Sequence, residues 1–204
     1  SQIKKIYFPL WAELDAYPEL DEAQNLSANI YDYPISRIKK IAPLLIEGMV
    51  YGWEFSYTPQ DNARNVKENL EITEIVPSDF FLQHITFSSV WLENERMNCW
   101  VTFERNESQI QYYNLWASIK NPVIHGRGYG KLSDGFDGIK NAAEESLKNA
   151  VREHFRAIIK NKPKQINGKV LIKEPPTLGI DAGKYVINLD FFLEYDKIVE
   201  YKVF

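Results

Sequence analysis

The chain has 204 residues, of which 45% are hydrophobic and 25% are charged, and its net charge is −4. This composition is typical of a globular protein and excludes an intrinsically disordered chain. The mild acidity argues against a nucleic-acid-binding protein, which gathers Lys and Arg on one face to displace counterions. No apolar run approaches the roughly 18 residues of a membrane-spanning helix, so the sequence predicts no such segment.

Cysteine usage and the start of the chain bear on the compartment. Cys99 is the single cysteine, so no intramolecular disulfide can form, and its strand-like surroundings predict a buried, unreactive thiol. The chain opens at Ser1 without an initiator Met, as it would after removal of a signal peptide or after trimming. We expect a periplasmic or secreted protein, with a cytoplasmic one as the alternative.

The N-terminal segment combines an apolar run with a long polar stretch. Residues 3–14 are apolar but contain Pro9, which predicts an edge strand because proline cannot donate to a central ladder. Residues 15–34 are rich in Asp, Asn, Glu and Pro and are expected to form a surface loop, with a short helix near Asp21–Leu26. A loop of this length is often functional.

Two short helices and two strands are expected next. Residues 36–47 carry an apolar helical face, although Pro43 is expected to kink or split this helix, and Gly48 to end it. Residues 61–68 are predicted to form a second short helix, with Asp61 as its cap. Strands are expected at 49–57 and 70–75.

Residues 84–120 have the pattern of a three-stranded meander. Its strands are predicted at 85–92, 97–104 and 110–119, joined by short polar loops. Aromatic residues crowd this region and the strand before it: Tyr51, Trp53, Phe55, Tyr57, Trp91, Trp100, Tyr112, Tyr113 and Trp116. Aromatic rings can bind sugars or peptides, but core packing is the favoured interpretation. An exposed row would instead mark an interaction surface.

A long amphipathic helix is predicted at about 134–161. Apolar residues recur there at three- and four-residue intervals, and Pro163 follows the helix. Leu147, Val151, Phe155 and Ile158 are expected to pack on a sheet made by the meander and a terminal hairpin. A basic group follows, consisting of Lys160, Lys162, Lys164 and Lys169. Complementing the negative helix end is the favoured role of these lysines over an anion site.

The C-terminal segment is predicted to be strand-rich. Asn167-Gly168 favours a tight turn before a strand at 169–173. Residues 185–195 and 198–204 alternate in polarity, which predicts the terminal hairpin. The fold class is therefore α+β, with mainly antiparallel sheets and the long helix packed on one face. The whole chain, 1–204, is expected to form one unit, and the alternative is a division into 1–120 and 121–204.

A glycine-rich stretch before the long helix is the strongest candidate for a ligand site. Backbone N–H groups of such a turn can hold an anion at a helix N-terminus. The spacing fits neither a P-loop nor a dinucleotide-binding motif, since Leu132 and Lys131 replace required residues. Asp134 and Asp137 would also repel an anion. A flexible strand-to-helix connection is favoured, and the candidate ligand residues are His125, Gly126, Arg127, Gly128, Gly130 and Lys131.

Other chemistry-bearing residues lack the spacing of known sites. The histidines, His84, His125 and His154, have no second ligand at a metal-binding spacing, and no Gly-x-Ser-x-Gly nucleophile motif occurs. Two carboxylate pairs are expected to be solvated: Glu71 with Glu74, and Asp190 with Glu194. The sequence therefore predicts no catalytic residue, no metal and no cofactor.

The functional prediction follows from these exclusions. We expect a non-enzymatic binding or assembly module of the cell envelope or secreted space. Its partner would be a protein or peptide, bound through an exposed strand edge or an aromatic patch. The alternative is a small hydrolase or an anion-binding, enzyme-like domain with its site near His125–Gly130.

Overall fold

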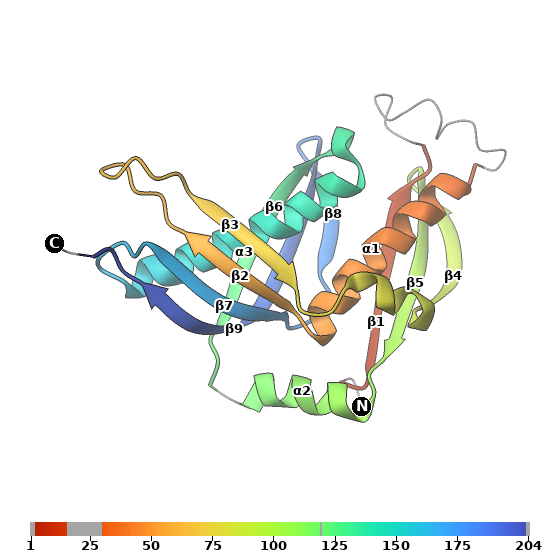
Figure 1. The fold of residues 1–204 in the computed structure, drawn as a ribbon. Helices are drawn as coiled ribbons and strands as arrows, with labels where there is room; N and C mark the ends of the chain where they lie inside the picture. Colours follow the sequence, from red (N-terminus) through yellow and green to blue (C-terminus); the bar gives the residue numbers. More distant parts are fainter. Residues whose placement is uncertain (1–2, 16–29, 119, 203–204) are drawn as a thin grey trace.

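The computed structural model describes residues 3–15, 30–118 and 120–202. They form an α+β fold with two antiparallel sheets (Figure 1), which confirms the predicted fold class. The short helix predicted near Asp21–Leu26 lies outside the described residues. No helix in the described part of the chain is long and apolar enough to cross a membrane.

The smaller sheet has three strands in the order β1-β5-β4. Their bounds are β1 Lys5–Glu13, β4 Thr86–Glu93 and β5 Arg96–Glu104. The predicted edge strand is confirmed, because β1 is at the end of this strand order and pairs with β5 on one side. Pro9 of β1 lies opposite Trp100 of β5. Two of the three meander strands, β4 and β5, also form as predicted.

The larger sheet has six strands. Its path is β3-β2-β7-β9-β6, and β8 pairs with β9. The strands are β2 Trp53–Thr58, β3 Asn69–Glu74, β6 Val123–Lys131, β7 Gln165–Ile172, β8 Thr177–Asp181 and β9 Lys184–Val199. The predicted terminal hairpin is wrong, because β9 continues through Asp196-Lys197 as one strand. Asn167-Gly168 lies within β7 at an irregularity of its pairing, where a tight turn was predicted.

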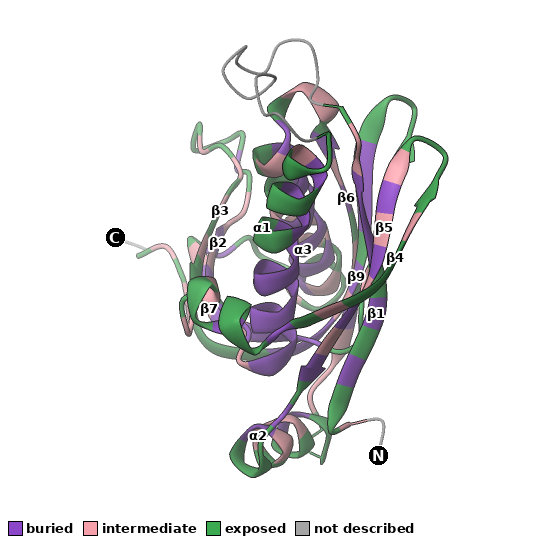
Figure 2. Cartoon of the chain, turned by 90° about the vertical axis from the view of Figure 1, so that its right-hand side faces the viewer, coloured by how far each residue is buried: buried purple, intermediate pink, exposed green. Residues whose placement is uncertain are grey.

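Helix α1, Asp32–Val50, lies between the sheets (Figure 2). It contacts β1 and β5 on one side and β7 on the other, and Ile41, Ile46 and Val50 are completely buried. The helix is longer than the predicted 36–47 and runs through Pro43, because burial between two sheets offsets the lost backbone hydrogen bond.

Gly48 does not end α1 as predicted. A Cβ on Gly48 would lie 2.5 Å from Cδ1 of Ile172 in β7. The glycine is therefore explained by close packing against the larger sheet. The core cluster contains residues on both sides of position 120, from Ile6 to Leu193. The division of the chain into domains stays a prediction.

Helix α3, Phe136–Ile158, confirms the long amphipathic helix. It packs on β6 and β9 of the larger sheet and not on the meander. Leu147, Val151 and Phe155 are buried as predicted, whereas Ile158 is 54% exposed. Short 3-10 helices occur at Ser78–His84 (η2) and Leu132–Asp134 (η3).

The third predicted meander strand, 110–119, is wrong: helix α2 spans Glu107–Ser118. The side chain of Asn106 accepts a hydrogen bond from the Gln109 backbone N–H at 2.9 Å, and Gln109 Oε1 accepts one from the Asn106 N–H at 2.9 Å. This reciprocal cap starts the helix. Trp116 of α2 packs on Leu171 and Phe192 of the larger sheet.

The predicted helix at 61–68 is wrong as well. The segment forms turns closed by a bridge between Asp61 and Val66, and Asn65 has a φ of 54°. Asp61 accepts a hydrogen bond from the Arg64 backbone N–H at 3.2 Å. The side chain thus stabilises the connection between paired β2 and β3 where a helix cap was expected.

Candidate functional site

The glycine-rich stretch is a strand, β6, and not the flexible connection favoured by the sequence. Gly126, Gly128 and Gly130 alternate along it and face α3. A Cβ on them would lie 1.8, 1.9 and 1.7 Å from backbone oxygens of Ser146, Ala142 and Gly138. The backbone of α3 therefore rests directly on β6, which only glycine permits.

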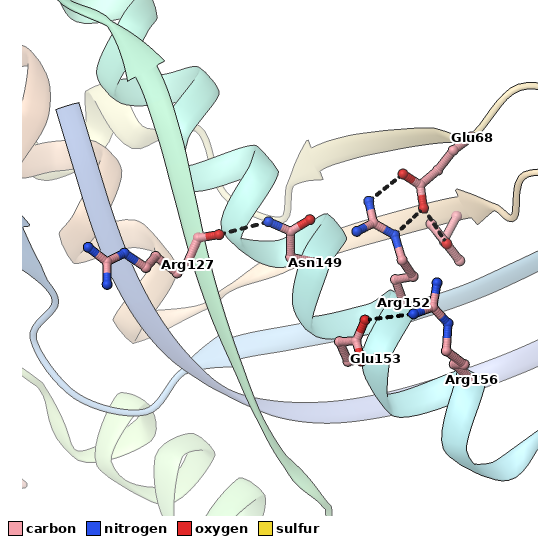
Figure 3. A network of polar contacts seen from close by, with 7 residues as sticks. Glu68, Arg127, Asn149, Arg152, Glu153 and Arg156 are labelled. Carbon is pink, nitrogen blue, oxygen red and sulfur yellow. Dashed lines mark hydrogen bonds and ion pairs between the residues drawn. The ribbon is translucent and has the colours of Figure 1, made fainter. Parts of the chain in front are cut away.

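The other residues of the stretch project from the opposite face of β6. His125 Nδ1 lies 2.5 Å from Asp190 Oδ1, and Arg127 lies 3.2 Å from Asp181. The side chains of His125 and Arg127 are more than half exposed, and ion pairs of this kind contribute little to stability. The backbone oxygen of Arg127 accepts a hydrogen bond from the Asn149 side chain at 2.8 Å, drawn as a dashed line in Figure 3.

Lys131 and Gly130 lie at a different place from His125. Together with Tyr129 they line a hollow of about 530 Å³, whose other residues include Asp134, Glu145 and Asp181. Lys184 also lines the hollow, so three carboxylates face two lysines there and the balance of charge does not favour an anionic ligand. The six predicted ligand residues thus share one strand but are divided between its two faces, and of the six Gly130 and Lys131 line this hollow.

Two of the carboxylates that the sequence grouped in pairs have other partners. Asp190 pairs with His125, while Glu74 accepts a hydrogen bond from the Ser78 N–H at 2.8 Å. Within the described ranges, no group of three His, Cys, Asp or Glu side chains could hold a metal ion. Cys99 is buried as predicted, and burial raises the pKa of its thiol to about 11.

One carboxylate is buried in the core. Glu47 of α1 has no exposed surface, and burial, followed by repulsion from Glu74, raises its pKa to about 8. Trp53 Nε1 and the backbone of Ile75 and Val76 approach its carboxyl group but fall short of hydrogen-bond geometry. Glu47 lines none of the main hollows formed by the described residues, and its carboxyl group is enclosed by the core.

The aromatic residues divide into two groups. Trp53, Phe55 and Tyr57 of β2 are buried in the core, as favoured by the sequence. Tyr7 and Trp100 instead stack on the outer face of the three-stranded sheet, with ring centroids 4.4 Å apart and planes inclined by 12°.

Tyr7, Trp91 and Trp100 form what we call the aromatic face. Trp91 adds a tilted contact, with its ring centroid 6.3 Å from that of Trp100 and the ring planes inclined by 39°. Tyr7 is 48% exposed and both tryptophans are partly exposed. The face arises because alternate residues of β1 and β5, such as Phe8 and Val101, point inward to α1. The outward residues are left as an exposed row.

Strand β4 lies at the edge of this sheet, next to the aromatic face. Val90 is 62% exposed and Leu92 is 52% exposed. The pairing of β4 with β5 shifts register between Ser88 and Trp91, where Ser89 has a φ of 51°. An edge strand presents backbone donors and acceptors to a further strand, and a bulge limits the length over which such pairing can run.

Charged groups around the aromatic face have both signs. The Lys5 ammonium lies 4.9 Å from the Tyr7 ring centroid, and Trp91 Nε1 donates to Glu93 at 3.3 Å. Arg96 lies 3.9 Å above the ring of buried Trp11. The surroundings therefore favour neither a strongly acidic nor a strongly basic partner.

An uncharacterised protein of Treponema pallidum (strain Nichols) is 27% identical over 199 residues, which cover 98% of this chain and 83% of that protein. No solved structure matches. A protein-family model matches residues 1–201, and the chain belongs to that family.

Proposed function

We propose that the protein is a non-enzymatic binding module that takes up an extended peptide segment of a partner protein. The observation that carries this proposal is the partly exposed aromatic face, Tyr7, Trp100 and Trp91, beside the edge strand β4, which pairs only with β5 among the described residues. In strand-addition recognition an edge strand supplies main-chain hydrogen bonds to an extended peptide, and neighbouring exposed aromatic rings add apolar contact area for its side chains.

In this mode of binding, the backbone of the peptide pairs with the outward N–H and C=O groups of β4. Every second peptide side chain then contacts Trp91 and the aromatic face, while the others contact the exposed Val90 and Leu92. The bulge at Ser89 restricts pairing to a short segment on either side. We therefore expect a short extended segment with aromatic or aliphatic residues at alternate positions.

The alternative function, a hydrolase or anion-binding domain near His125–Gly130, has less support. Close packing against α3 accounts for Gly126, Gly128 and Gly130 without a ligand. Two side chains of the stretch, His125 and Arg127, already have carboxylate partners in Asp190 and Asp181. Peptide binding by the three-stranded sheet is therefore the better supported proposal.

The test uses peptides selected from a random displayed library on the purified protein. We expect Trp91→Ala/Trp100→Ala and, separately, Val90→Lys/Leu92→Lys to weaken binding about tenfold or more. Tyr195→Ala is the matched control, because Tyr195 is 44% exposed on the other sheet. Peptide binding should also slow hydrogen exchange of backbone amides within 86–93.

Two outcomes would contradict the proposal. One is equal binding of the selected peptides to the wild type and to both double variants, with all proteins folded. The other is protection from exchange that maps to 125–131 instead of β4, which would favour the alternative site.

We also propose the cell envelope or secreted space as the place of action, as expected from the sequence. A fusion of the complete gene to alkaline phosphatase tests this, because that enzyme is active only after export. An inactive fusion that is expressed at a normal level would contradict export and indicate a cytoplasmic protein.

A further inference from the structure

A second hollow lies at the C-terminal end of α3, on the far side of the larger sheet from α2. It has a volume of about 730 Å³, within the range of small-molecule sites. We call it the basic groove. Its lining residues are Tyr57, Pro59, Gln60, Asn62, Glu68 and Ile166, with Arg152, Phe155, Arg156, Ile159, Lys160, Lys162 and Pro163.

The groove has an apolar floor. Phe155 of α3, Tyr57 of β2 and Ile166 of β7 are buried there and belong to the core. Ile159, just past the helix end, is partly exposed and packs against the same cluster. The floor therefore offers a ligand a fixed apolar surface that is continuous with the protein interior.

The rim carries an excess of positive charge. Four cationic side chains and one carboxylate, Glu68, line the groove. Glu68 is already engaged: it accepts a hydrogen bond from Tyr57 at 2.7 Å and one from Arg152 Nε at 2.6 Å, and Arg152 makes a second contact with its other oxygen. The charges of Arg152 and Glu68 therefore neutralise each other, and this pair, shown in Figure 3, forms an uncharged part of the groove lining.

Three cations remain on the rim: Arg156, Lys160 and Lys162. Arg156 is 70% exposed and its partner in α3, Glu153, is 65% exposed at 3.2 Å, so this pairing is weak. Lys162 donates to the backbone oxygen of Gln60 at 2.8 Å, which positions its ammonium without neutralising its charge. Lys160 is exposed.

The helix dipole accounts for part of this charge. Arg156 lies in the last turn of α3, where a cation is favourable. Lys160 and Lys162 come after the helix ends at Ile158, and they border the same hollow as the apolar floor. The dipole effect falls off within a turn, so it does not explain why cations and an apolar floor converge.

We propose that the basic groove binds a small amphipathic anion: one carboxylate, sulfonate or phosphate head on an aromatic or alkyl body. The head lies among Arg156, Lys160 and Lys162, and the body lies on Phe155 and Ile159. Charge complementarity selects the anion, since the only lining carboxylate is taken up by Arg152 and Tyr57.

The experiment compares two fluorescent probes of similar shape. The sulfonate 8-anilinonaphthalene-1-sulfonate carries the anionic head, and N-phenyl-1-naphthylamine is its uncharged counterpart. We expect Arg156→Gln/Lys160→Gln/Lys162→Gln to weaken binding of the sulfonate about tenfold and to leave binding of the uncharged probe within about twofold.

The matched control removes the same charge elsewhere. Lys4, Lys120 and Lys173 are exposed and do not line the groove. We expect Lys4→Gln/Lys120→Gln/Lys173→Gln to bind both probes as the wild type does. If the triple groove variant unfolds, the three single variants replace it, each with a loss of about twofold.

Two results would overturn the proposal. Unchanged sulfonate binding in a folded groove variant would remove the role of the cations. An equal loss of both probes, or an equal effect of the control variant, would mean that the cations act on stability or on net charge alone. Neither result bears on peptide binding at β4, so the two proposals fail independently.

Discussion

Replacing Gly128 by alanine tests the direct contact between β6 and α3. A Cβ on Gly128 would lie 1.9 Å from the backbone oxygen of Ala142 and 2.5 Å from the backbone nitrogen of Ser146. Both atoms belong to the helix backbone, so the clash is relieved only if α3 moves away from the sheet. Overpacking costs about 1–3 kcal/mol, and more where the backbone must shift. We expect a loss of about 3 kcal/mol in the free energy of unfolding.

Thermal and urea unfolding measure this loss. For a chain of this size, about 3 kcal/mol corresponds to a fall in melting temperature of roughly 6–12 °C. Gly179→Ala is the matched control, since a Cβ there meets Val186 Cγ1 at an ordinary 3.6 Å. Alanine is favoured over glycine in strands by about 0.5–1 kcal/mol, so the control should be neutral or stabilising. A Gly128→Ala protein as stable as this control would refute the close packing of β6 on α3.

Three further substitutions or treatments test the interior. Burial and Glu74 raise the pKa of Glu47 to about 8 from 4.5, so the folded protein retains a proton that the unfolded chain releases. Stability should therefore fall as pH rises from about 4.5 to 8, by up to about 1.4 kcal/mol per pH unit, and urea unfolding of Glu47→Gln should lack this slope. Glu68→Gln breaks the half-buried pair with Arg152 and should lower the free energy of unfolding by about 1–3 kcal/mol. Glu153→Gln breaks the exposed pair with Arg156 and should lower it by under about 0.5 kcal/mol. Equal losses would contradict a stronger contribution from the half-buried pair. Cys99, whose thiol pKa is raised to about 11 by burial, should react with a disulfide reagent at neutral pH only after unfolding, and rapid reaction in the native protein would contradict its burial.

The candidate binding surface could not be identified from the sequence. Trp53 and Phe55 alternate along a strand in the same way as Tyr7 and Pro9, and both strands are rich in aromatics. The first pair is buried, whereas Tyr7 is exposed, because α1 covers only the inner face of the three-stranded sheet. Which face of a strand is covered depends on an element distant in the sequence, and alternation alone does not contain that information.

At residues 110–119 the alternation of apolar and polar residues led to the prediction of a strand, although a helix-capping signal precedes them in the sequence. Asn106 and Gln109 have the spacing of a capping box, and they form one in the structure. Tyr112 and Trp116 are one helical turn apart and contact each other edge to face. The cap could have identified α2, whereas the partners of its aromatic side chains could not be predicted.

The sequence by itself determined the features that depend on neighbouring residues. The three- and four-residue spacing of Leu147, Val151 and Phe155 was enough to predict α3, because an amphipathic helix repeats within its own length. Pro9 was enough to predict an edge strand, because the missing N–H is a property of one residue.

Only the tertiary structure decided the features that depend on distant contacts. Pro43 is compatible with a continuous α1 because two sheets bury the helix on both sides. Gly126, Gly128 and Gly130 suggested a flexible connection or, as the less favoured alternative, a ligand-binding turn, yet they lie in a strand under the backbone of α3. A glycine accommodates a turn, a ligand or a second backbone equally well, and what occupies the space beside it is decided by how the rest of the chain packs.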